Sequence, residues 1–251
     1  MWSGKTVSLA GHQVTDGEAE IRVHPISYNE WIACYDPRYA QAFEDADLPK
    51  PYAGIGVSVL IESQDRLIPL TRRGIATPVY PGRLYSPGGG PKPGQTSVEA
   101  ILEEILEETG LRNGEHFDDL DLFMMAFVAD TNFAGSRHSR PELVAGLPAR
   151  VGYRDIEAIQ QERLRKKGTK ETDVWGLEPV SSSPASLAQF IKLHGGEMCP
   201  PTEAALTWEL YSIWEREVGP EKAFAEVADF VGEVGRYQRE KFRVPILLLG
   251  D

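Results

Sequence analysis

The stretch from Ser86 to Leu111 reads Ser-Pro-Gly-Gly-Gly-Pro-Lys-Pro-Gly-Gln-Thr-Ser-Val-Glu-Ala-Ile-Leu-Glu-Glu-Ile-Leu-Glu-Glu-Thr-Gly-Leu. It begins as a glycine-rich loop and continues with the apolar spacing of a helix. The helix carries five glutamates, and no lysine or arginine lies between Ser97 and Leu111. At about 100° per residue, Glu103, Glu104, Glu107 and Glu108 share one side. We expect the other side to pack on the fold through its apolar residues, which are Val98, Ile101, Leu102, Ile105 and Leu106.

A row of carboxylates is unfavourable as plain structure. Glu104 and Glu108 are like charges four residues apart, a pair that costs about 0.2–0.5 kcal/mol. Glu107 and Glu108 also lie in the last turn before Gly110, the expected C-cap, where the helix dipole repels anions. One interpretation is a solvated acidic face. The other is a site for a divalent cation such as Mg²⁺, which takes oxygen ligands and bridges carboxylates to phosphates.

These residues resemble the signature of the Nudix hydrolases, G-x5-E-x7-R-E-U-x-E-E-x-G-U, where U is aliphatic. Gly89 takes the first position, and agreement continues at Glu104, Ile105, Glu107, Glu108, Gly110 and Leu111, so that seven of nine defined positions match. The two departures are polar: Gln95 stands where the family has Glu, and Glu103 stands where it has Arg.

The resemblance implies an α/β/α sandwich with a mixed sheet and hydrolysis of a nucleoside diphosphate linked to another group. It implies Mg²⁺, with Mn²⁺ as a substitute, held by Glu104, Glu107 and Glu108, which also count as catalytic residues. A further carboxylate beyond the signature is expected as the base. The candidates are Glu142, Glu171 and Asp173, of which Glu171 is preferred.

The departures leave the role of Glu103 open. In the family the arginine at this position orients a catalytic glutamate, and the glutamate at the position of Gln95 supports the signature. Glu103 has three interpretations here: a metal ligand, a partner of a distant arginine, or the mark of a site with reduced activity. A Nudix-like binding module without catalysis is therefore the alternative to an active hydrolase.

The order and spacing of short sequence stretches indicate a substrate class. The run from Tyr80 to Gly90, the irregular signature and the stretch from Gly168 to Gly176 look similar to the UDP-glucose pyrophosphatases, which cleave UDP-sugars. UDP-glucose is therefore the expected substrate, with UMP and sugar 1-phosphate as products. ADP-ribose and coenzyme A are alternatives within the same chemistry.

Composition sets outer bounds on function. Of the 251 residues, 41% are hydrophobic and 25% are charged, which is typical of a soluble globular protein. The formal net charge of −12 argues against general nucleic-acid binding. Two cysteines, Cys34 and Cys199, give no disulfide framework or zinc spacing. With no apolar run long enough for a membrane span and no signal-peptide pattern at the N-terminus, we expect a cytoplasmic protein.

Residues 1–53 are expected to form a leading unit, separate from the core. Short strands are predicted at Val7–Leu9 and Ile21–His24 with a turn at Asp16-Gly17, followed by a helix capped by Ser27. An aromatic cluster between residues 28 and 43 is interpreted as core packing. Pro49 and Pro51 mark the boundary.

The core is expected to span residues 54–200. A buried strand at residues 54–62 is predicted to form a hairpin with residues 67–72. Three arginines near this hairpin and the glycine loop, Arg72, Arg73 and Arg83, are candidate ligands of a diphosphate or, alternatively, solvated charges. Gly88 and Gly89 would let backbone amides approach phosphate oxygens.

The remaining segments alternate strands and helices. Strands are predicted at residues 119–130, 142–151 and 174–180, with a polar loop that contains His138. A helix at residues 153–167 ends in a basic cluster, interpreted as dipole compensation or as recruitment of an anionic substrate. Further helices are predicted from Ser183 or Ser186 to Leu193, at 201–218 and at 221–241. Residues 201–251 form the C-terminal helical segment, whose aromatic side chains suit core packing or a homodimer.

Overall fold

The computed structural model describes residues 5–15, 18–27, 54–75, 77, 80–130, 140–167 and 174–242. At the N-terminus, β1 (Lys5–Thr15) and β2 (Glu18–Ser27) form an antiparallel hairpin. Both strands are longer than expected, and the N-terminal elaboration is a β-hairpin where its residues are described. The predicted helix after Ser27, the aromatic cluster and the boundary prolines lie outside the described residues.

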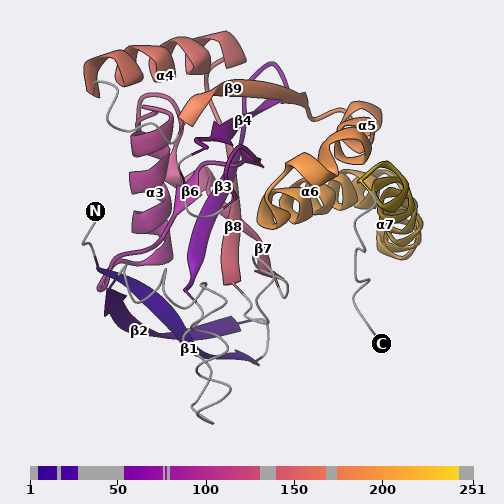
Figure 1. Ribbon diagram of the computed structural model, residues 1–251, viewed down its shortest axis with the longest axis horizontal. Coiled ribbons are helices and arrows are strands. Elements are labelled where there is room, and N and C mark those ends of the chain that lie inside the picture. Colours follow the sequence, from indigo (N-terminus) through magenta and orange to yellow (C-terminus); the bar gives the residue numbers. More distant parts are fainter. Residues whose placement is uncertain are drawn as a thin grey trace.

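The central sheet is mixed and four-stranded, in the order β6-β3-β8-β7. Its strands are β3 (Gly56–Glu62), β6 (Gly88–Gly89), β7 (Phe123–Asp130) and β8 (Arg140–Pro148). β3 runs parallel to β8, whereas the β3–β6 and β7–β8 pairs are antiparallel. The short strand β6 therefore places the glycine loop at the edge of the sheet, beside β3 (Figure 1).

A second, three-stranded sheet has the order β5-β4-β9, with β4 at Leu67–Arg73, β5 at Leu84–Tyr85 and β9 at Val174–Ser181. The predicted hairpin between residues 54–62 and 67–72 is wrong. A tight turn does join the strands, because the Ser63 amide donates to the Leu67 carbonyl at 2.9 Å. However, β6 and β8 occupy both edges of β3, so β4 pairs with β5 and β9 instead.

Helices cover the sheets from two sides, as expected for an α/β/α arrangement (Figure 1). They are α3 (Ser97–Glu108), α4 (Tyr153–Lys167), α5 (Pro184–His194), α6 (Pro200–Val218) and α7 (Pro220–Phe242). Short 3-10 turns, η1 and η3, occupy Asp119–Asp121 and Gly195–Glu197. The α4 bounds agree with the predicted 153–167, and α5, α6 and α7 begin within one residue of prediction when Ser183 is taken as the α5 start.

The side chains of strand β3 point alternately into two apolar cores. Val57, Val59 and Ile61 pack with Ile101 and Ile105 of α3, whereas Leu60 belongs to the core formed with α5, α6 and α7. This period of two is what a strand buried on both faces requires. The sheet therefore fixes α3 on one side and the C-terminal helices on the other.

The C-terminal helices are also joined to the second sheet. Leu84 of β5 forms a β-bridge with Met198, and the Ser86 amide donates to the Thr202 hydroxyl of α6 at 3.0 Å. Trp214 and Phe230 pack edge to face, with ring centroids 6.2 Å apart, against the same core. In contrast, the side chains of Trp208 and Phe224 are exposed. No helix within the described ranges is long and apolar enough to cross a membrane.

Candidate active site

The start of α3 is fixed by a capping box. The Glu99 amide donates to the Thr96 hydroxyl at 3.1 Å, and the Glu99 carboxylate accepts from the Thr96 amide at 2.8 Å. Accepting this backbone hydrogen bond lowers the pKa of Glu99. Glu99 thus stabilises the start of α3. This structural role differs from the one expected of the later glutamates.

The face that α3 buries differs from the predicted one. Ala100, Ile101 and Ile105 are buried, but Val98 and Leu106 are 43% and 41% exposed. The predicted packing through Val98 and Leu106 is therefore wrong. The helix is rotated toward β6, and this rotation half-buries three of its glutamates, Glu103, Glu104 and Glu108.

Glu104 and Glu108 converge on the glycine pair of β6. The Gly88 amide donates to Glu108 Oε2 at 3.1 Å. A Cβ added to Gly89 would lie 2.1 Å from Glu104 Oε1, so the carboxylate occupies the space that any side chain at this position would need. Two carboxylates one helical turn apart are thereby held against the backbone of the glycine loop.

Glycine is required at both positions of β6, for different reasons. At Gly88 an added Cβ would lie 2.3 Å from the Val57 carbonyl oxygen, which belongs to the neighbouring strand. At Gly89 the obstacle is the Glu104 carboxylate, at the end of a flexible side chain. These contacts explain why both residues are glycine, and the explanation does not depend on a bound phosphate.

Glu107 lies in the same turn but faces solvent, and its main chain is tied to α4. The Arg163 Nε donates to the Glu107 carbonyl at 2.7 Å, and the buried Gln160 side chain donates to the Glu108 carbonyl at 3.1 Å. The helix ends at Glu108 with Thr109 as its C-cap, and Gly110 follows with a positive φ of 81°. Donors from α4 therefore satisfy terminal carbonyls of α3 and offset its negative end.

Replacing Arg163 with methionine is expected to lower the free energy of unfolding by about 0.3–1 kcal/mol, because a cation at a helix C-terminus is lost. Urea denaturation at low and high salt would measure this, and the difference should shrink with salt. Arg154→Met is the matched control, since Arg154 pairs with Glu157 within α4. Equal losses in the two variants would contradict the role given to Arg163.

The two departures from the signature contact each other. Gln95 Nε2 donates to Glu103 Oε2 at 2.7 Å, and Lys92 Nζ lies 2.5 Å from Glu103 Oε1. The hydrogen bond between their side chains raises the pKa of Lys92 and is the main cause of a lowered pKa for Glu103. Of the three interpretations of Glu103, pairing with a cation describes this geometry. The partner is a lysine from the loop, whereas a distant arginine was expected.

The three candidate arginines all lie in the second sheet or its connections. Arg72 pairs with Glu178 of β9, with Nη2 to Oε1 at 2.6 Å, and Arg73 lies over the Tyr85 ring at 4.8 Å. Arg83 donates to the Met198 carbonyl at 3.0 Å. Each guanidinium thus has a partner within the fold, so substrate binding by these residues stays a prediction.

Among the candidate bases, the structure describes only Glu142. It is fully buried on β8, where it is opposite Gly56 of β3, next to Val57, the partner of Gly89. Since neighbouring strands are about 4.8 Å apart, the backbones of Glu142 and Gly89 are roughly 10 Å apart across β3. The register therefore brings Glu142 to the same end of the sheet as Glu104 and Glu108. Glu171, Asp173 and His138 lie outside the described residues.

The described residues contain no group of three or more His, Cys, Asp or Glu side chains arranged to hold a metal ion. The donors at β6 nevertheless fit Mg²⁺ in their chemistry, because this ion commonly takes one or two carboxylates and completes its shell with water and substrate phosphates. Glu104 and Glu108 supply such a pair. Glu107 is exposed one residue away and is free of the packing that holds the other two.

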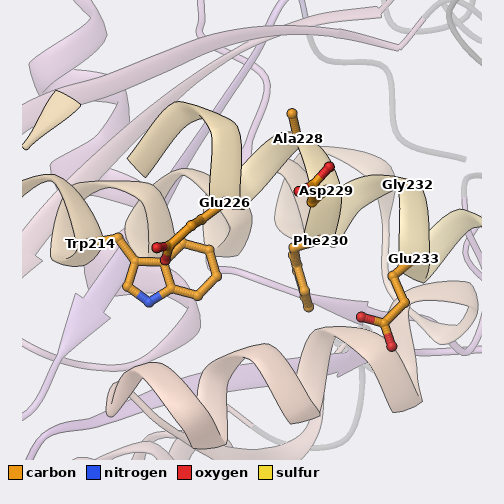
Figure 2. Close-up of a pocket in the computed structure, with 7 residues that line it drawn as sticks. All are labelled: Trp214, Glu226, Ala228, Asp229, Phe230, Gly232 and Glu233. Atoms are coloured by element: carbon orange, nitrogen blue, oxygen red, sulfur yellow. The ribbon is translucent and has the colours of Figure 1, made fainter. Parts of the chain in front are cut away.

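A separate hollow of about 510 Å³ lies at α6 and α7 (Figure 2). Trp214 and Phe230 contribute aromatic side chains to it, and Glu226 and Glu233 contribute carboxylates. Its described lining includes no residue of α3 or of the glycine loop. We therefore place the candidate active site at β6 and α3, where the acidic and glycine features of the sequence meet.

The fold and this site define an α/β protein with carboxylates held at a glycine loop. Comparison with known proteins agrees: the model of the NUDIX domain family matches residues 53–145. The matched residues include the stretch from Gly89 to Leu111 that carries the resemblance.

Individual relatives are more distant. The chain is 35% identical over 134 residues to the m7GpppN-mRNA hydrolase NUDT17 of Xenopus laevis, and the match covers 48% of this chain and 41% of that protein. It is similar to the structure of a NUDIX hydrolase from Nitrosomonas europaea, with 16% identity, a TM-score of 0.42 and coverage of 64% of this chain and 89% of that one. A UDP-X diphosphatase structure has 16% identity and a TM-score of 0.38, and covers 70% of this chain and 71% of that one. At these TM-scores the two structures carry no argument about substrate.

Lys92 and Arg163 were not identified as site residues from the sequence alone. The absence of cations between residues 97 and 111 was a signal that cations must come from elsewhere. The sequence does contain the basic cluster of α4, and dipole compensation is one of its two interpretations. The sequence did not show that Arg163 serves the end of another helix, since this depends on how α4 packs on α3.

Proposed function

We propose that this protein is a Mg²⁺-dependent hydrolase that cleaves the diphosphate bond of a nucleoside diphosphate linked to another group. The observation that carries the proposal is the convergence of Glu104 and Glu108 on Gly88 and Gly89. The NUDIX domain match over residues 53–145 supports the same reaction class.

The reaction makes two demands. The diphosphate charge must be neutralised, and a water molecule must lose a proton as its oxygen attacks phosphorus and the bridging P–O bond breaks. Mg²⁺, when bound, supplies charge neutralisation and makes a coordinated water more acidic. Glu104 and Glu108 would hold the ion, and the exposed Glu107 is free to join them or to accept a proton. Glu142 and Glu171 are the further candidates for the base.

The substrate follows from two different lines of support. Similarity of layout to the UDP-glucose pyrophosphatases favours UDP-glucose, which would give UMP and glucose 1-phosphate. The 35% identity to a protein named as an m7GpppN-mRNA hydrolase favours a capped dinucleotide as the second candidate. A net charge of −12 disfavours a long RNA body, so we propose a small nucleotide derivative in either case.

A panel assay tests the proposal. UDP-glucose, ADP-ribose, coenzyme A and an m7GpppG dinucleotide would be incubated with the protein in Mg²⁺, in Mn²⁺ and without metal, and released nucleotide would be measured. We expect turnover only with metal, and loss of it in Glu107→Gln and Glu108→Gln. Binding of these compounds without turnover would overturn the hydrolase and leave a nucleotide-binding module.

The oligomeric state is a separate proposal. The exposed aromatic side chains of Trp208 and Phe224 on α6 and α7 suit contact with a second copy. Light scattering of the protein after size exclusion would measure its mass. A monomer at all concentrations would contradict the homodimer.

A further inference from the structure

We propose that Lys92 is a positioning residue: with Gln95 it clasps Glu103, and this clasp holds the glycine loop on α3 so that Glu104 and Glu108 face β6. The proposal rests on the hydrolase proposed above and concerns the same site. It assigns a function to the two residues at which this chain departs from the Nudix signature.

The turn that carries Lys92 is well defined. Lys92, Pro93, Gly94 and Gln95 form a β-turn in which the Gln95 amide donates to the Lys92 carbonyl at 3.1 Å. Gly94 has a φ of 88° and follows a proline, the arrangement of a type II turn. A second bond, from the Lys92 amide to Gln95 Oε1 at 2.8 Å, closes the turn further. The two side chains that leave this turn are thus preorganised.

Both side chains end on the same carboxylate. Lys92 Nζ reaches one oxygen of Glu103 and Gln95 Nε2 reaches the other, at 2.5 and 2.7 Å. One residue further along α3 lies Glu104, whose carboxylate fills the space beside Gly89. The clasp and the Glu104 contact therefore join the same loop to the same helix at adjacent positions.

The charges of the clasp are rearranged relative to the signature. The family pattern has an acid at the position of Gln95 and a cation at the position of Glu103. Here the helix carries the acid, Glu103, and the loop supplies the cation, Lys92. In the family pattern and in this chain alike, the charges of the acid and the cation cancel. This exchange explains why Glu103 does not add an unbalanced anion to the glutamate row.

The exchange makes a prediction that the signature alone would not. Restoring the family residue by Glu103→Arg should place two cations together and open the clasp. We expect it to lower kcat/KM at least about tenfold, since small displacements of catalytic groups have effects of this size. Lys92→Glu should do the same by opposing two carboxylates. The double variant K92E/E103R restores an opposite pair and should recover most of the lost activity.

Lys92 and Glu103 are 47% and 34% exposed, so their pairing contributes little to global stability. A readout of loop position is therefore needed beside turnover. Hydrogen exchange of the amides from Gly88 to Gln95, measured by NMR, should quicken in each single variant and slow again in the double variant. The affinity for Mn²⁺, titrated by electron paramagnetic resonance, should follow the same order.

The exposed pair of Lys222 and Glu226 on α7 provides a matched control. Lys222→Glu should leave exchange in the glycine loop and kcat/KM as in the wild type. If the wild type has no turnover on any substrate but loop exchange follows the charge pattern, the hydrolase fails and the clasp stands. If Glu103→Arg matches the wild type in turnover, Mn²⁺ affinity and loop exchange, the clasp is overturned.

Discussion

Glu108→Gln and Glu104→Gln are each expected to reduce kcat by more than about 10–100-fold, the range seen when a group that only supports a metal ligand is lost. Glutamine has nearly the same shape as glutamate and retains an oxygen that can accept from the Gly88 amide. It lacks the charge that a divalent cation requires. The change therefore removes metal binding with little change in packing.

The same two substitutions should leave the stability of the fold unchanged or raise it slightly. Glu104 and Glu108 are like charges four residues apart, and each neutralisation removes a repulsion of about 0.2–0.5 kcal/mol. Glu108 also lies at the negative end of the helix dipole. Thermal unfolding without metal is thus expected to show an unchanged or slightly raised Tm, while calorimetric Mg²⁺ binding is lost.

Glu99→Gln serves as the control for this pair of variants. It makes the same change on the same helix, and glutamine is accepted at this position of a capping box. It should retain metal-dependent turnover. Full Mg²⁺-dependent activity in Glu104→Gln and Glu108→Gln would show that neither carboxylate is a ligand.

Predictions from sequence succeeded where local pattern decides the structure. The bounds of α4, and the starts of α5, α6 and α7, follow from helical spacing and from Ser and Pro at the helix starts. The hairpin of β3 with β4 failed because local spacing identifies strands but not their partners. The partners of β3 are β6, two residues long, and β8, about eighty residues away in the chain.

The placement of the candidate residues was predictable in part for the same reason, and their functional roles stay a prediction. Glu104 and Glu108 come from a spacing that a single helix preserves, and the structure holds both at the glycine loop. The contact of Lys92 with Glu103 depends on how a turn folds back on the helix, which no period in the sequence encodes. The exposure of Val98 and Leu106 likewise depends on how α3 is rotated on the sheet.

Alanine at Gly88 and at Gly89 is expected to separate stability from activity at adjacent positions. In Gly88→Ala the new Cβ meets the backbone of β3, 2.3 Å from the Val57 carbonyl oxygen and 2.7 Å from Ser58 Cα. A strand backbone cannot move aside locally, so β6 must separate from β3. Overpacking of this kind costs about 1–3 kcal/mol. Each kcal/mol lowers the Tm of a chain of this size by about 2–4 °C.

In Gly89→Ala the new Cβ meets the Glu104 carboxylate, which can rotate away at little cost in stability. The rotation takes one proposed ligand out of the site, so we expect a near-normal Tm with kcat/KM reduced by up to about 10²-fold. Gly152→Ala is the control for both variants, because its Cβ would make ordinary contacts of 3.7 Å or more. Differential scanning calorimetry and the turnover assay would be run on all three proteins.

The two substitutions add the same methyl group, so any difference between them reports what the methyl group meets. A stable, inactive Gly89→Ala beside a destabilised Gly88→Ala would assign different roles to the two glycines of β6. Gly88 would be needed for close approach of the β3 backbone, and Gly89 would be needed to leave room for the Glu104 carboxylate. A fully active Gly89→Ala would contradict this, because turnover would then not depend on Glu104 beside the loop. In that case the acidic face of α3 would have to act through Glu107 and Glu108 alone.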